Sequence, residues 1–130
     1  MSDFTNTYED RIVNKVLRNT DYTSDATVYV ALFSAFADTE NGAGTEITGT
    51  GYSRQTATFA APSNGATSNS GAITWTNSSG GTWTITHLSL MNHASTNGAA
   101  NNIMVKAFSK SVPNGDTLTI AIGDLDVTVA

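Results

Sequence analysis

Residues 26–36 read Ala-Thr-Val-Tyr-Val-Ala-Leu-Phe-Ser-Ala-Phe, a run that is apolar at nearly every position. A strand with one face in water alternates apolar and polar residues, whereas a strand covered on both faces need not alternate. The run therefore predicts a strand that is buried on both sides.

Further strand-like segments follow this run, several of them with clear alternation. In one of them Ile73 and Trp75 share a face, and in the last one Leu125 and Val127 oppose Asp126. Polar turns separate the segments, and residues 62–71 consist almost wholly of turn-forming residues. The expected strands are residues 26–36, 52–59, 72–76, 82–91, 103–109, 117–122 and 125–129.

The composition agrees with a small all-β protein. The chain has 130 residues, which suits one domain, and it contains 21 Thr, 13 Ser and 12 Asn. Thr favours strands, while Asn and Ser favour turns, so a helical bundle is excluded as the main body. We predict an all-β fold, a jelly-roll-like two-sheet β-sandwich of about seven to eight strands with an N-terminal helical arm.

The arm is predicted from apolar residues that recur at helical spacing, namely Tyr8, Ile12, Val16, Val13 and Leu17. We place the helical arm at residues 1–22 and the sandwich at residues 23–130. Half of the six cations of the chain form one strip along this helix, because Arg11, Lys15 and Arg18 are spaced four and three residues apart. The strip is either an ordinary solvated face or a contact for an acidic partner surface.

A second candidate contact region is residues 38–51, which hold four Gly and three acids. This composition predicts a long mobile loop at one end of the domain, and long loops are commonly functional. We predict that Glu40, Asn41 and Glu46 in this loop, together with Arg11, Lys15 and Arg18, bind a partner.

Charge and composition exclude several classes of function. The formal net charge is -5, which opposes binding to nucleic acid. The chain has no Cys, so its fold depends on neither disulfides nor thiolate metal sites. Charged residues interrupt the first 20 residues and no apolar run is long enough to span a bilayer, so we expect neither a secretory signal nor a membrane protein.

The sequence offers few groups for catalysis. It has two His and lacks the nucleophile, phosphate-binding and zinc-peptidase motifs. His87 alternates with Ile85 and is expected on the same strand face in a structural or interface role, while His93 is expected at the surface. We therefore predict no enzymatic activity and no cofactor.

Two residue pairs have alternative interpretations. Asp124 and Asp126 flank Leu125 and would point the same way from a strand, either as a charged edge that discourages strand pairing or as ligands for a hard cation. Trp75 and Trp83 flank a turn and are either core residues or an exposed platform for a sugar.

Three stretches of the sequence, taken together, form a pattern that is specific enough to compare with known families. They are Leu17-Arg18-Asn19-Thr20 with Tyr22-Thr23 and residues 26–33; Gly51-Tyr52 with Arg54-Gln55 and residues 58–65; and Gly81-Thr82 with Thr86-His87. In this combination the chain resembles a family of small bacteriophage virion proteins, usually labelled phage tail fibre proteins and also similar to capsid cement or decoration subunits. It departs from the family pattern at Asp25 and at Asn92-His93, and no catalytic or metal residue belongs to that pattern.

The resemblance implies a structural virion protein that is synthesised in the host cytoplasm. We predict a capsid decoration or cement subunit on the outer capsid surface, a homo-oligomer (dimer or trimer) that bridges neighbouring copies of the major capsid protein. The alternative is a tail or tail-fibre component that binds a host surface glycan or adapts tail proteins to one another.

Overall fold

The apolar run at residues 26–36 forms β1 (Val28–Ala35), a central strand of the larger sheet in this computed structural model, which describes residues 4–129. Its neighbours are β6 (Trp83–Met91) on one side and the short strands β2 (Thr45–Glu46) and β3 (Gln55–Ala57) on the other. Next to β6 lies β7 (Asn102–Val112), and all the pairings are antiparallel. Residues 30–33 are fully buried, which confirms a strand covered on both faces.

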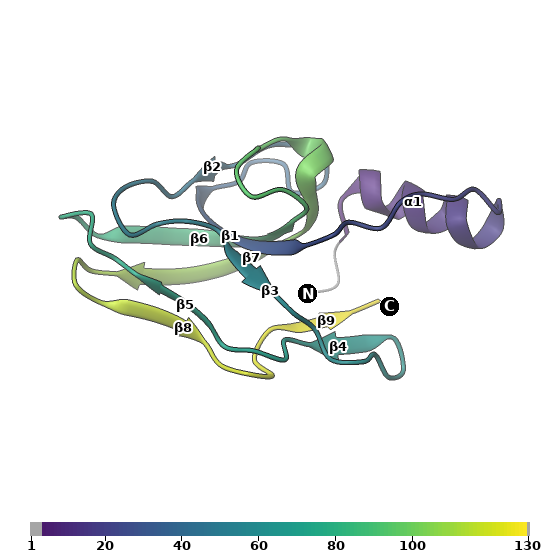
Figure 1. Cartoon of the computed structure of the whole chain (residues 1–130). Coiled ribbons are helices and arrows are strands. Elements are labelled where there is room, and N and C mark those ends of the chain that lie inside the picture. The colour runs from purple at the N-terminus through teal and green to yellow at the C-terminus, as the bar shows by residue number, and fades with distance from the viewer. Residues whose placement is uncertain (1–3, 130) are drawn as a thin grey trace.

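A second layer faces this sheet and consists of two separate ribbons (Figure 1). One ribbon pairs β5 (Ile73–Thr76) with β8 (Thr117–Ile120), and the other pairs β4 (Ala66–Ser68) with β9 (Asp126–Thr128). The all-β sandwich with an N-terminal helix is thereby confirmed. The jelly-roll arrangement is not, because its second layer would be one continuous sheet.

The main core fills the space between the two layers. Trp75 and Trp83 are 1% and 3% exposed and pack there with Leu32, Ile85 and Leu88. The interpretation of the tryptophans as a sugar platform is therefore wrong. A smaller cluster forms on the outer face of the larger sheet and consists of Ala31, Phe33, Phe36, Met91 and Val105.

Several strand boundaries differ from the sequence-based expectation, and pairing with a neighbour explains the differences. β4 lies inside residues 62–71, which were expected to be turns, because its backbone pairs with β9 in the register Thr67 to Val127. β7 continues to Val112, beyond its predicted end at residue 109, since it follows β6 as far as Trp83. The predicted strand at residues 52–59 is shortened to β3.

An irregularity in the pairing of β6 with β7 accompanies a change in the direction of His87. The register with β7 shifts between Ile85 and His87, so that Ile85 and Leu88 both reach the main core. His87 instead lies against the ring of Phe36 on the outer face, with 5.9 Å between ring centroids. The prediction that Ile85 and His87 share a face is wrong, because such an irregularity interrupts the alternation of side chains.

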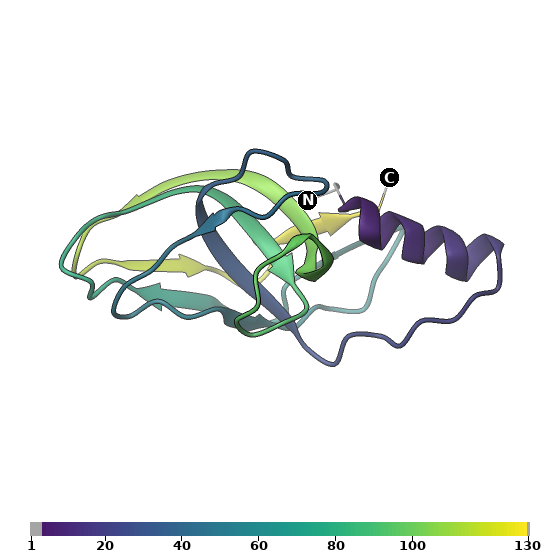
Figure 2. The ribbon, with the colours of Figure 1, turned by 90° about the horizontal axis from the view of Figure 1, so that it is seen from above.

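The single α-helix of the described residues, α1 (Asn6–Leu17), projects from one end of the sandwich, and residues 18–27 return from it to β1 (Figures 1 and 2). Within residues 6–17 Tyr8 alone is buried. Thr5 occupies the N-cap position, but its hydroxyl donates to the carbonyl of Asn102 instead of capping the helix. In residues 4–129 no helix combines the length and hydropathy that a bilayer span requires.

Candidate functional site

The apolar side of α1 is the most exposed apolar feature of the fold. Val13 is 49% exposed, Val16 71% and Leu17 77%. A helix of 12 residues is about 18 Å long, so the last two of these residues lie far from the sandwich. An amphipathic helix normally buries such a stripe, and an unburied one marks a contact surface. We call residues 6–17 with this stripe the arm.

The predicted cation strip of the arm is partly engaged within the chain. The guanidinium of Arg11 lies 4.5 Å from the ring centre of Tyr8 and 3.9 Å from a carboxylate oxygen of Asp25. Lys15 is paired with Asp21. Arg18 donates to the side chain of Asn14 at 2.9 Å and has no ion pair within residues 4–129. The role of these cations in partner binding stays a prediction, and Arg18 is the one whose charge is available.

The arm is rooted in the larger sheet. The backbone N–H of Thr5 donates to the carbonyl of Ile103 at 2.9 Å, and its hydroxyl donates to the carbonyl of Asn102 at 2.6 Å. Phe4 forms a bridge with Met104 in the same register. The residues before the helix thus pair with the beginning of β7, which fixes the point from which the arm projects.

The hydroxyl of Tyr8 fixes the returning chain at the base of the arm. It donates to the carboxylate of Asp25 at 2.5 Å and accepts from the amide of Asn92 at 2.8 Å. Burial, followed by the hydrogen bond to Asp25, raises the pKa of Tyr8 to about 12. Asp25 and Asn92 thus bind the same hydroxyl from two different segments of the chain.

Residues 40 and 41 of the predicted loop lie beside the first turn of the arm. The carbonyl of Glu40 accepts from the backbone N–H of Asn6 at 3.2 Å, and the side-chain oxygen of Asn41 accepts from the amide of Asn6 at 2.9 Å. Glu40 and Asn41 are exposed. The structure therefore brings part of the predicted loop to the arm, while binding of a partner there stays a prediction.

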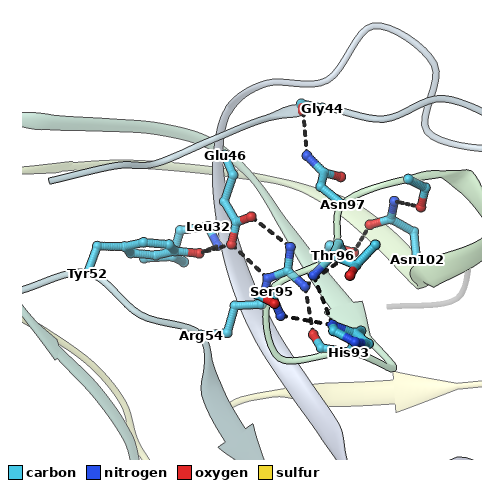
Figure 3. A network of polar contacts seen from close by, with 12 residues as sticks. Leu32, Gly44, Glu46, Tyr52, Arg54, His93, Ser95, Thr96, Asn97 and Asn102 are labelled. Carbon is cyan, nitrogen blue, oxygen red and sulfur yellow. Dashed lines mark hydrogen bonds and ion pairs between the residues drawn. The ribbon is translucent and has the colours of Figure 1, made fainter.

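Glu46, the third predicted loop residue, is occupied inside the chain (Figure 3). Its two carboxylate oxygens accept from Nε and Nη2 of Arg54 at 2.8 and 2.7 Å, and one of them also accepts from the hydroxyl of Tyr52 at 2.6 Å. Burial and the hydrogen bond to Glu46 raise the pKa of Tyr52. The carboxylate of Glu46 thus stabilises the fold and is half-buried.

Arg54 ties two loops together. Its Nη1 donates to the carbonyls of His93 and Thr96 at 2.6 and 3.1 Å. His93 is exposed, as predicted, and its Nδ1 accepts from the backbone N–H groups of the turn that follows it. Ile47 is buried next to Glu46, so the prediction of a mobile loop over all of residues 38–51 is wrong.

The role of Arg54 could not be predicted from the sequence, although the residue lies in one of the stretches that carry the family resemblance. The local sequence around an arginine does not indicate its hydrogen-bond partners when these are distant along the chain. Glu46 precedes Arg54 by eight residues, and the carbonyls of His93 and Thr96 follow some forty residues later. The buried asparagines Asn69, Asn77 and Asn102 were missed for the same reason.

Asp124 and Asp126 lie at a cavity of about 360 Å³ on the side of the sandwich. Asp124 lies in the turn before β9, not in a strand as predicted, but both residues line this cavity together with Lys106. Across residues 4–129 no group of three or more His, Cys, Asp or Glu is arranged to hold a metal ion.

The observed features define a class of protein: a small β-sandwich with a projecting arm whose apolar side is uncovered, as expected of a subunit in a larger assembly. The family described as Podophage GP4 fiber I protein gp80 matches residues 3–128, and the chain belongs to this family. No curated protein matches the chain. Membership of a phage fibre family makes this a structural virion protein of the tail-fibre type. It also favours a role without enzymatic activity. The predicted resemblance to capsid decoration subunits is not confirmed.

Proposed function

We propose that this protein is a subunit of a phage tail fibre and that the arm joins it to neighbouring subunits. Two observations support the proposal: the family is named for a fibre protein, and the arm exposes Val13, Val16 and Leu17. The exposed apolar side of the arm carries the argument, since it has no cover within residues 4–129.

The size of the contact fits a repeated assembly. Full burial of an aliphatic side chain contributes about 1.5–3 kcal/mol, and these three side chains are between half and three-quarters exposed. Together they supply a few kcal/mol, which is too little for a tight isolated pair once the entropy of association is subtracted. Several such contacts within one assembly reinforce each other by raising the effective concentration.

The predicted decoration role would use the same arm with the major capsid protein as partner. We place the protein on the tail instead, because the family name favours a fibre. The two roles differ in copy number: a shell subunit is needed at every repeat of the lattice, whereas the number of tail fibres follows the symmetry of the tail.

Binding of a host glycan was part of the tail-fibre alternative. The aromatic pair considered for it, Trp75 and Trp83, is buried in the core and offers no platform. Our proposal therefore assigns the protein an assembly role and does not assign a sugar site.

The test is the position of the protein on purified particles. Antibodies against the sandwich, detected by immunogold electron microscopy, should label the tail. Particles assembled with Leu17→Asp should lack the protein, whereas the matched change Thr7→Asp in the first turn of the same helix should leave incorporation intact. Labelling spread over the capsid shell would refute the proposal.

A further inference from the structure

The two layers of the sandwich leave a cavity on one side. Opposite it, β3 lies against β5 and joins the layers. The cavity, about 360 Å³ in volume, opens between β7 and β8 and continues to the turn before β9. Its lining is mainly apolar and includes Leu88, Ala107, Phe108, Ile120 and Leu125, with charged residues at the rim.

Two strands with an open edge border this cavity. Beyond Met104, where Phe4 bridges it, β7 has no strand on its outer side among the described residues 4–129, and β8 pairs there with β5 alone. In β7, Lys106 and Ala107 are exposed and Phe108 is half-buried. Soluble proteins rarely leave an apolar cavity beside open strand edges uncovered unless it receives a partner.

The arm of the same chain does not cover this cavity. It begins beside the start of β7, where Thr5 binds the carbonyl of Ile103, and it points away from the sandwich (Figure 2). Val16 and Leu17 therefore lie about 15 Å or more beyond that point along the helix axis. They are placed to reach a second copy of the chain.

We infer that the arm of one copy docks in this cavity of a second copy, with Val16 and Leu17 against its apolar lining. The inference rests on the proposed function, since it names the neighbour that the arm contacts. The contact covers both uncovered apolar surfaces of the chain, because the arm of one copy fills the cavity of the next.

The rim of the cavity carries two carboxylates, Asp124 and Asp126, against one cation, Lys106, and the arm ends at a cation, Arg18. Arg18 at the end of the arm and Asp124 at the rim of the cavity both lack an ion pair within residues 4–129. Residues 26–129 carry six Asp and Glu against three Lys and Arg, whereas the last turn of the helix, from Lys15 to Arg18, holds two cations and no acid. A basic arm end is thus attracted to the acidic sandwich of another copy, and this attraction weakens with salt.

The contact joins two different surfaces, so it is heterologous. Such contacts close into a ring if the rotation between copies allows it, and otherwise form a filament. Both outcomes suit a fibre component. A symmetric contact between two arms would instead end at a dimer or a small bundle.

The absence of cysteine from the chain allows a direct test. Purified Leu17→Cys and Ala107→Cys proteins are mixed under mild oxidation, and disulfide-linked dimers are counted over time. We expect the mixture to form dimers about tenfold faster than either protein alone, because docking raises the effective concentration of the two thiols. The matched control replaces Ala107→Cys with Lys110→Cys, a position on the same strand outside the cavity.

Two results would overturn the inference. Faster cross-linking of Leu17→Cys with itself than in the mixture would show a contact between arms. A mixture that reacts no faster than the Lys110→Cys control would show that the cavity does not receive the arm. Both results are obtained without phage particles, so they are independent of whether labelling places the protein on the tail.

A second measurement uses no cysteine. Sedimentation of the purified protein should reveal self-association between about 10 µM and 1 mM, the range expected of a small interface. Leu17→Asp and Ala107→Glu should each abolish it, yet a mixture of the two should form a heterodimer through one intact arm and one intact cavity. Monomeric behaviour of the unaltered protein throughout this range would contradict the inference.

Discussion

Removal of the carboxylate of Glu46 should destabilise the fold strongly, because it leaves the charge of Arg54 without its counterion. The side chain of Arg54 is 2% exposed, so water cannot replace the lost carboxylate. Breaking a buried pair in this way costs about 3–5 kcal/mol. Since Arg54 keeps the carbonyls of His93 and Thr96, we expect Glu46→Ala to cost about 3 kcal/mol, near the lower end of that range.

The assay is equilibrium unfolding in urea together with thermal unfolding followed by circular dichroism. For a chain of this length the expected cost corresponds to a fall in Tm of roughly 10–15 °C. The control is Glu40→Ala, which removes an exposed carboxylate from the same loop and should change stability by less than about 0.5 kcal/mol.

The double variant Glu46→Leu with Arg54→Met removes both charges, so it tests whether the loss in Glu46→Ala comes from the unpaired charge of Arg54. An apolar pair of similar volume often matches a buried ion pair in stability, so the double variant should recover part of the loss, while the carbonyls of His93 and Thr96 lose their donor. If Glu46→Ala unfolds at the same urea concentration as Glu40→Ala, the network in Figure 3 does not stabilise these loops and the reasoning is refuted.

Three further predictions concern the core, the base of the arm and one turn. Trp75→Phe should cost about 1–2 kcal/mol more than Trp83→Phe, since Nε1 of Trp75 donates to a backbone carbonyl whereas the buried Nε1 of Trp83 has no partner within residues 4–129. The pKa of Tyr8, about 12, lies above its ordinary value of 10, so its contribution to stability is intact below pH 10 and is lost as the pH rises to 12; Tyr8→Phe should flatten the fall in stability over that interval. Gly51→Ala should cost more than Gly80→Ala, because both have positive φ but a Cβ at Gly51 would lie 2.3 Å from a carbonyl oxygen, while at Gly80 it meets nothing within 4 Å.

Each of these predictions has a contradicting result. Equal urea midpoints for the two tryptophan variants would remove the distinction between their indole groups. An unchanged pH profile in Tyr8→Phe would mean that this hydroxyl does not titrate with unfolding. Equal losses at the two glycines would show that the turn at Gly51 yields to the added methyl group.

Strands with a strong pattern of their own were predictable from the sequence. The apolar run at residues 26–36 forms the central strand, and the alternation at Ile73 and Trp75 places both side chains in the core. β4 was not predictable, because the three residues Ala66–Ser68 form a strand only through their pairing with β9. The irregularity at His87 likewise depends on register with β7 and leaves no pattern in the chain.

The arm could be predicted as a helix but not as an uncovered one. Spacing alone places Ile12, Val13, Val16 and Leu17 on one side, and it would do so equally for a helix packed on the sandwich. The direction of the arm depends on contacts between distant residues, such as that of Tyr8 with Asn92, which local sequence does not encode.

The most direct test of the central claim, that this is a fibre subunit joined to its neighbours through the arm, is a cryo-electron microscopy map of the intact phage. The account predicts sandwich-shaped density in a tail appendage, with each helix buried against the next copy of the same chain. Density for the sandwich on the capsid shell, or helices that extend into solvent on the tail, would contradict it.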